Sequence, residues 1–278
     1  MRTTTNFRNA ALLACLCATL ASPALGLSLI TNGGFEAGFA GWTRVDQLGS
    51  DGTFFLQTGT TSPVTAYAVP APPEDTFAAM TDAGGPGSHV LLQTFTFAAP
   101  VPSAVLSFDY FVGNRDVDVF GEPGTFRTPN TLDFSTPTLN QQARVDILSA
   151  SADPFSLAPA DVLLALYRTE VGDALVSVYT PRSFDITAFA NAHIGSPLTL
   201  RFAEVDNVAP FQFGVDRVAL EVGSVAVAEP SSAALTGLAV LLLWTMRKRP
   251  VVSAVGFNHL IRWSLVRIQY GLPIGTSA

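Results

Sequence analysis

Thiols are nearly absent from this chain. Its two cysteines, Cys15 and Cys17, lie in one apolar run close to the first residue. We expect this run to be removed with a leader, which leaves the remaining domain without a thiol. Disulfides, cysteine-ligated zinc and cysteine nucleophiles are thereby excluded from that domain.

Positive charge is scarce between Glu36 and Glu229, the interval that holds all 22 carboxylates. Eight basic residues share the interval and all are arginines, so its formal charge is −14. Nucleic-acid binding requires clustered Lys and Arg that neutralise phosphates. We therefore expect no nucleic-acid partner, whereas a bound divalent cation is compatible with this charge.

Enzyme motifs are also missing. The domain has two histidines, His89 and His193, and no Gly-x-Ser-x-Gly, His-Glu-x-x-His or phosphate-binding loop. Ser88 precedes His89 in sequence, which does not orient a general base toward a nucleophile. Asp116 and Asp118 form a carboxylate pair that suits either a solvated loop or a cation or glycosidase site. We expect a protein without catalytic activity.

The pattern that dominates residues 27–223 is that of β-strands. Leu106, Phe108, Tyr110 and Val112 alternate with other residues, which predicts a strand with one buried face. Further strands are expected at Leu27–Thr31, Trp42–Val45, Val64–Val69, Val90–Phe97, Ala143–Ser149, Val162–Thr169, Leu175–Tyr179, Leu198–Phe202 and Phe211–Val222. A long loop is expected at Gly113–Gln142. The sequence predicts an all-β fold, an antiparallel β-sandwich or jelly roll.

The first 26 residues have the features of a secretory signal peptide. Arg2 and Arg8 precede an apolar run at Ala10–Leu20, and Ala24–Gly26 supplies small residues for cleavage. An uncleaved membrane helix is the alternative, but the run is shorter than the ~20 residues of a span.

A second apolar segment follows the domain. Ala233–Met246 is bounded by Glu229, Pro230 and Ser231 on one side and by a basic cluster on the other. The basic cluster, a membrane stop, consists of Arg247, Lys248 and Arg249. We expect a single short transmembrane helix with the acidic domain outside, because basic residues stay on the cytoplasmic side.

In this order, Val-Ala-Glu-Pro-Ser, a short apolar helix and a basic cluster resemble the PEP-CTERM sorting signal, over Val227–Arg249. The resemblance implies an exosortase-type membrane protease as partner, with Glu229, Pro230 and Ser231 as the sorting motif. It also implies association with exopolysaccharide or biofilm. Ala228 replaces the leading proline of the family, and a basic extension at 250–278 follows the point where the family stops. This extension is either a cytoplasmic tail or the product of a frameshift or missed stop.

The domain itself resembles galactose-binding-like and carbohydrate-binding jelly rolls at both ends. Asn32-Gly33-Gly34-Phe35-Glu36 and Gly41-Trp42 are similar to the opening strand of these folds. Phe184–Ala188, Leu198–Phe202 and Gly214–Leu220 are similar to their closing strands.

This second resemblance implies a structural calcium ion near the first and last strands, with Glu36, Asp216 and backbone carbonyls as ligands. Asp216 shares strand parity with Val218 and Leu220, which places its carboxylate in the core, where it needs a partner. A β-bulge that turns Asp216 outward is the alternative, because Val215 lies in the opposite phase.

Aromatic side chains suited to stacking on sugars are few. Trp42 is the domain's only tryptophan, and we expect it in the core. Tyr67, Tyr110, Tyr167 and Tyr179 remain, with Tyr110 on a face that is expected to be buried.

Together these features predict a non-catalytic exported protein of the cell envelope, the cell surface or the extracellular matrix. Its domains are expected at 1–26 (signal peptide), 27–223 (sandwich), 224–249 (sorting and anchor segment) and 250–278. The alternative is a secreted carbohydrate-binding module or carbohydrate-active enzyme on the same scaffold.

Overall fold

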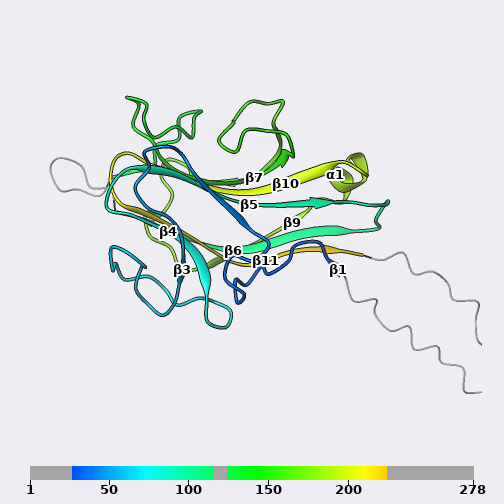
Figure 1. Cartoon of the computed structure of the whole chain (residues 1–278), viewed down its shortest axis with the longest axis horizontal. Coiled ribbons are helices and arrows are strands. Elements are labelled where there is room, and N and C mark those ends of the chain that lie inside the picture. Colours follow the sequence, from blue (N-terminus) through cyan, green and yellow to red (C-terminus); the bar gives the residue numbers. More distant parts are fainter. Residues whose placement is uncertain (1–26, 116–123, 224–278) are drawn as a thin grey trace, which may run out of the picture. The chain divides into compact units, whose positions relative to one another are not determined.

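A computed structural model describes residues 27–115 and 124–223, which form two antiparallel β-sheets packed face to face (Figure 1). The first sheet contains, in spatial order, β3 (Thr53–Gln57), β4 (Ala78–Asp82), β11 (Phe211–Val222), β6 (Ala104–Asn114) and β9 (Thr180–Asp185), and β1 (Leu27–Ser28) also pairs with β11. The second contains β2 (Thr43–Asp46), β5 (Gly87–Thr96), β10 (Pro197–Asp206), β7 (Gln141–Ser149) and β8 (Val162–Arg168). The short helix α1 (Thr187–Ala192) links β9 to β10.

The strand pairs are nested. β7 pairs with β8, β6 with β9, β5 with β10, and β4 with β11, as in one long hairpin rolled up into two sheets. From β4 to β7, and again from β8 to β11, successive strands alternate between the sheets, which places β5 and β10 in one layer and β6 and β11 in the other (Figure 1). This nesting is the topology of a jelly roll, and it confirms the predicted fold class.

The core lies between the sheets and follows the period of two. Leu91 and Phe95 of β5 face Phe108 of β6, while Leu198 and Phe202 of β10 fill the same layer. All of these side chains are nearly excluded from solvent. The described residues of the sandwich thus form a contiguous hydrophobic core between the sheets.

A β-bulge divides β11. The pairing of β11 with β6 shifts between Asp216 and Ala219, and Arg217 adopts a φ of 49° in the left-handed region. Phe213 and Val215 face the core before the bulge, whereas Val218 and Leu220 face it afterwards. The extra residue thus reverses the strand's phase and keeps apolar side chains inward along its whole length.

The opening motif packs against this bulge. Val218 N donates a hydrogen bond to Gly33 O (3.1 Å), and a Cβ at Gly33 would lie 1.8 Å from Val218 O. Any side chain at Gly33 would therefore push the first segment away from the last strand. This contact gives a physical reason for a glycine in the opening motif.

Several expected elements differ in the structure. The strands β3 and β4 were not predicted. For β4, the reason is that Ala78–Asp82 is buried on both faces and shows no alternation. Val64–Val69 forms a turn closed by the bridge between Thr61 and Ala68, since Asp82 Oδ2 accepts hydrogen bonds from two backbone amides there.

The other two differences flank β9. Leu175–Tyr179 is not a strand, and its Val176 and Val178 side chains are exposed. Phe184–Ala188 leaves the sheet at Asp185, whose carboxylate accepts a hydrogen bond from Thr187 N at the start of α1. The loop expected at Gly113–Gln142 overlaps both flanking strands, because β6 ends at Asn114 and β7 begins at Gln141. Its described residues 124–140 contain no strand, and a single bridge there joins Arg127 to Gln141.

Candidate functional site

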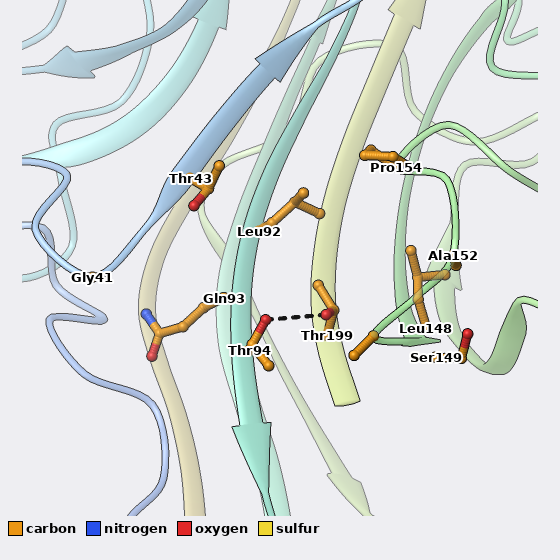
Figure 2. Close-up of a pocket in the computed structure, with 11 residues that line it drawn as sticks. Gly41, Thr43, Leu92, Gln93, Thr94, Leu148, Ser149, Ala152, Pro154 and Thr199 are labelled. Atoms are coloured by element: carbon orange, nitrogen blue, oxygen red, sulfur yellow. Dashed lines mark hydrogen bonds between the residues drawn. The ribbon is translucent and has the colours of Figure 1, made fainter. Parts of the chain in front are cut away.

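A groove of about 420 Å³ crosses the outer face of the five-stranded sheet (Figure 2). Its floor follows from register: Thr94 of β5 pairs with Thr199 of β10, which pairs with Leu148 of β7, and the three side chains share one face. The next row adds Leu92 and Thr43. Figure 2 shows the Thr94 and Thr199 hydroxyls linked by a hydrogen bond of 3.2 Å.

The groove is closed on one side by the loop that follows β7. Ala150, Ala152 and Pro154 of this loop line it, opposite Gly41 and Thr43 (Figure 2). The adjoining part of the same sheet face is covered, because Val90 and Val205 pack there against Leu132 and neighbouring loop residues. The groove occupies the part of this face that carries the threonines.

A buried ion pair holds the loop wall in place. Arg201 Nη1 donates hydrogen bonds to Pro154 O and Ser156 O, both at 2.8 Å. Its Nη2 contacts Asp146 Oδ2 at 2.5 Å, and Arg144 Nη2 contacts Asp146 Oδ1 at 2.7 Å. Burial lowers the pKa of Arg201 while Asp146 raises it, so the guanidinium stays charged at neutral pH.

The chemistry of the groove is that of neutral polar groups. Of the described residues that line it, none is titratable. The hydroxyls of Thr43, Thr94 and Thr199 can both donate and accept hydrogen bonds, and Leu92 adds apolar surface. Such a lining can bind a neutral polyhydroxyl ligand, and it contains no general acid or base.

The two residues expected to bind calcium hold one common loop. Glu36 Oε1 accepts hydrogen bonds from Thr76 N (2.9 Å) and Phe77 N (2.7 Å), while Asp216 Oδ2 accepts one from Glu74 N (3.2 Å). Within residues 27–115 and 124–223 there is no group of three or more His, Cys, Asp or Glu arranged to hold a metal ion. Calcium at Glu36 and Asp216 therefore stays a prediction.

The bulge decides which face Asp216 occupies. It lies on the side of the sheet opposite Val215 and the core, as the bulge alternative predicts, yet it is fully buried because the loop at residues 74–77 covers it. Burial raises the pKa of Asp216 to about 7, and the carboxylates of Glu74 and Asp109 add to the effect. The inward orientation expected from strand parity is wrong, because that parity ignores the bulge.

The segments expected to direct export lie outside the described residues. These are the signal peptide (1–26), the sorting motif Glu229, Pro230 and Ser231, the membrane stop Arg247, Lys248 and Arg249, and the extension at 250–278. Asp116 and Asp118 also lie outside them. Within the described part of the chain, no helix is long and apolar enough to cross a membrane.

The structure separates Ser88 from His89. The Ser88 hydroxyl accepts a hydrogen bond from Phe134 N on the outer face of the sheet. His89 faces inward, where its Nδ1 lies 2.7 Å from Asp46 Oδ1. The two side chains lie on opposite faces of the sheet and cannot act together.

Sequence reasoning missed Glu204, which pairs in register with His89. Glu204 is 1% exposed, and its Oε1 has no hydrogen-bond partner within the described residues. Burial raises the pKa of Glu204 well above its usual range, and the nearby Asp206 raises it further. The parity of β10, which places Glu204 on the same face as Phe202, was the available signal.

Two predictions about aromatic residues are confirmed. Trp42 is 7% exposed, packs against Phe35 and Phe202, and donates from Nε1 to Asn32 O. Tyr110 is also 7% exposed, on the core face.

Comparison with known proteins gives distant structural likenesses. No family model matches the chain, and no curated protein matches it. A family 11 carbohydrate-binding module from Clostridium thermocellum, solved with a β-1,3-1,4-mixed-linked tetrasaccharide, is 12% identical, covers 73% of this chain and 98% of its own, and has a TM-score of 0.36. TmCBM61, solved with β-1,4-galactotriose, is 10% identical over 70% of this chain and 98% of its own, with a TM-score of 0.37.

A Stig cyclase, Fisc from Fischerella sp. TAU, scores similarly: 17% identity, 71% of this chain, 98% of its own and a TM-score of 0.39. The absence of catalytic activity stays a prediction.

Proposed function

We propose that this is an exported, non-catalytic surface protein whose jelly roll binds a neutral polysaccharide in the groove on the five-stranded sheet. The observation that carries the proposal is the lining of that groove. Hydroxyls at Thr43, Thr94 and Thr199 match the mixed donor and acceptor character of sugar hydroxyls, and Leu92 suits the apolar face of a pyranose ring. No charged group in this lining demands a charged ligand.

The structural setting supports binding rather than catalysis. The His89 and Asp46 pair lies on the core-facing side of the sheet, away from the groove, and His89 is 2% exposed. We propose that residues 227–249 sort and anchor the chain, with an exosortase-type protease and the membrane as partners. The −14 charge between Glu36 and Glu229 fits an outward-facing domain with no nucleic-acid partner.

The binding proposal is tested with the purified domain, residues 27–223, on an array of neutral glycans. Thr94→Arg should weaken binding of any captured glycan at least roughly tenfold, because the long side chain fills the groove. Thr96→Arg is the matched control: Thr96 is exposed two residues along the same strand and face but does not line the groove.

Binding that survives Thr94→Arg, or an array with no captured neutral glycan, would contradict the proposal. Hydrolysis of any glycan in a parallel activity screen would contradict its non-catalytic part.

A further inference from the structure

A second groove, of about 570 Å³, lies between β8 and β9 and is called the edge groove here. β8 pairs with β7 alone and β9 with β6 alone among the described strands, so each ends its sheet on this side of the sandwich. The lining comes from residues 165–168 and 182–184 and includes Glu170 and Asp173. Its volume is within the range of small-molecule sites.

The edge groove holds a guanidinium in a defined position. Arg182 lies over two tyrosine rings, with its Cζ 5.4 Å from the centroid of Tyr110 and 5.7 Å from that of Tyr167. Its Nη2 donates a hydrogen bond of 3.1 Å to Tyr110 Oη. The two rings lie 4.3 Å apart and form one support for the cation. Because Arg182 is already held in place, it loses less side-chain entropy on binding a ligand than a free surface arginine would lose.

Both acidic residues of the lining have partners other than Arg182. Arg168 Nε lies 2.5 Å from Glu170 Oε1, and Asp173 Oδ2 accepts a hydrogen bond from Glu170 N (2.9 Å). No carboxylate of the described residues lies within ion-pair distance of Arg182. The guanidinium is exposed and has donors left for a bidentate carboxylate.

Aromatic surface lies beside this cation. Tyr167 and Phe184 line the edge groove and are partly exposed, and Phe184 stacks on Phe108 of the core at 5.8 Å between centroids. Burial raises the pKa of Tyr167 and so keeps its hydroxyl protonated. A ring that lies against these side chains would place a substituent near Arg182.

We infer that the edge groove is a second binding site, specific for an acidic sugar whose carboxylate pairs with Arg182 while its ring lies against Tyr167. This site is separate from the neutral groove on the sheet face and does not depend on it. The acidic charge of the whole domain does not prevent such binding, because exposed charges are screened beyond about 8 Å at physiological salt.

The test compares methyl glucuronide with methyl glucoside, which differ only in the carboxylate. Each is titrated into the purified domain, residues 27–223, and followed through the NMR shifts of the arginine Nε–H signals. We expect methyl glucuronide to shift the Arg182 signal and to bind at least roughly tenfold more tightly than methyl glucoside. Arg182→Gln should weaken methyl glucuronide binding by a similar factor, with an intermediate loss for Arg182→Lys.

Arg44→Gln is the matched control. Arg44 is also exposed and lies over a single ring, 4.5 Å from the centroid of Phe39, at the opposite edge of the five-stranded sheet. Its variant should bind methyl glucuronide as the natural domain does. Equal binding of the two sugars, no binding of either, or an unchanged affinity in Arg182→Gln with an unchanged melting curve would each overturn the inference. None of these outcomes bears on the neutral groove, which Thr94→Arg tests independently.

Discussion

The two faces of β10 bury charge in opposite ways. On the outer face, Arg201 is fully buried but has Asp146 and two loop carbonyls as partners. On the core face, Glu204 is as deeply buried, and the cationic partner that would match it is missing among the described residues. Three residues along one strand thus separate a compensated charge from an uncompensated acid.

The difference sets the electrostatic environment of each group. Asp146 forms ion pairs with Arg201 and Arg144, whereas Glu204 lies beside Asp206, whose pKa burial raises to about 7. The ion pairs of Asp146 hold the wall of the neutral groove at neutral pH. Glu204 retains its proton, because a buried charge without a cationic partner costs roughly several kcal/mol of desolvation free energy.

Removal of the compensating cation should have the largest effect. Arg201→Ala leaves Asp146 buried with Arg144 alone and removes both hydrogen bonds to the groove wall. We expect the free energy of unfolding to fall by about 3–5 kcal/mol in urea denaturation. Arg168→Ala, which breaks the exposed pair with Glu170, is the control and should cost at most about 1 kcal/mol. Similar losses for the two variants would show that burial of the pair does not matter.

The buried acids on the core face of β10 should make the stability of the domain depend on pH. Glu204 and Asp206 bind protons more tightly in the folded domain than in the unfolded chain. Their stabilising contribution is therefore complete below about pH 4 and is lost as pH rises through the folded pKa values. We expect the free energy of unfolding to decrease between roughly pH 5 and pH 8.

Glu204→Gln should reduce this slope and stabilise the domain at pH 8 by roughly 1 kcal/mol or more, since an amide carries no charge to bury. Glu221→Gln, at an exposed position of β11, should leave the slope unchanged. His89, Asp46 and Asp51 also lie near this acid row, so the pH profile of His89→Gln would reveal any contribution of the imidazole. A flat profile in the natural domain would contradict the proposed state of Glu204.

Asp216 is another buried carboxylate, and calcium is its predicted partner. If calcium binds, excess calcium should raise the melting midpoint. At a concentration 100-fold above Kd, the free energy of unfolding should rise by about 2.7 kcal/mol. A chelator should reverse the effect, and Asp216→Asn should abolish it. If neither calcium nor chelator changes the melting midpoint, Asp216 is, like Glu204, a buried acid without a bound cation.

Much of the fold was predictable from local patterns. Alternation at Leu106–Val112 and over Phe211–Val222 identified central strands, because a half-buried strand must place apolar residues at every second position. The same logic failed for Ala78–Asp82, which is buried on both faces, and for Val64–Val69, where Asp82 binds backbone amides of a turn. Short apolar runs carry no information about which distant carboxylate will satisfy their amides.

The functional sites were less accessible to sequence reasoning. Thr94 and Thr199 become neighbours only through the register of β5 and β10, and Arg182 reaches Tyr110 and Tyr167 only because β8 and β9 end their sheets on the same side. Each of these residue types is common on protein surfaces, so no local motif distinguishes them.

The sequence by itself determined the all-β class, the acidic and thiol-free character of the domain and the core position of Trp42, because composition and period depend only on residue order. Tertiary structure decided that β11 bulges beside Gly33, which places Asp216 under a loop instead of in the core. It also decided which buried acid receives a cation. Pairing between strands more than 50 residues apart sets these environments, and the desolvation and contacts that they impose are properties of the folded chain alone.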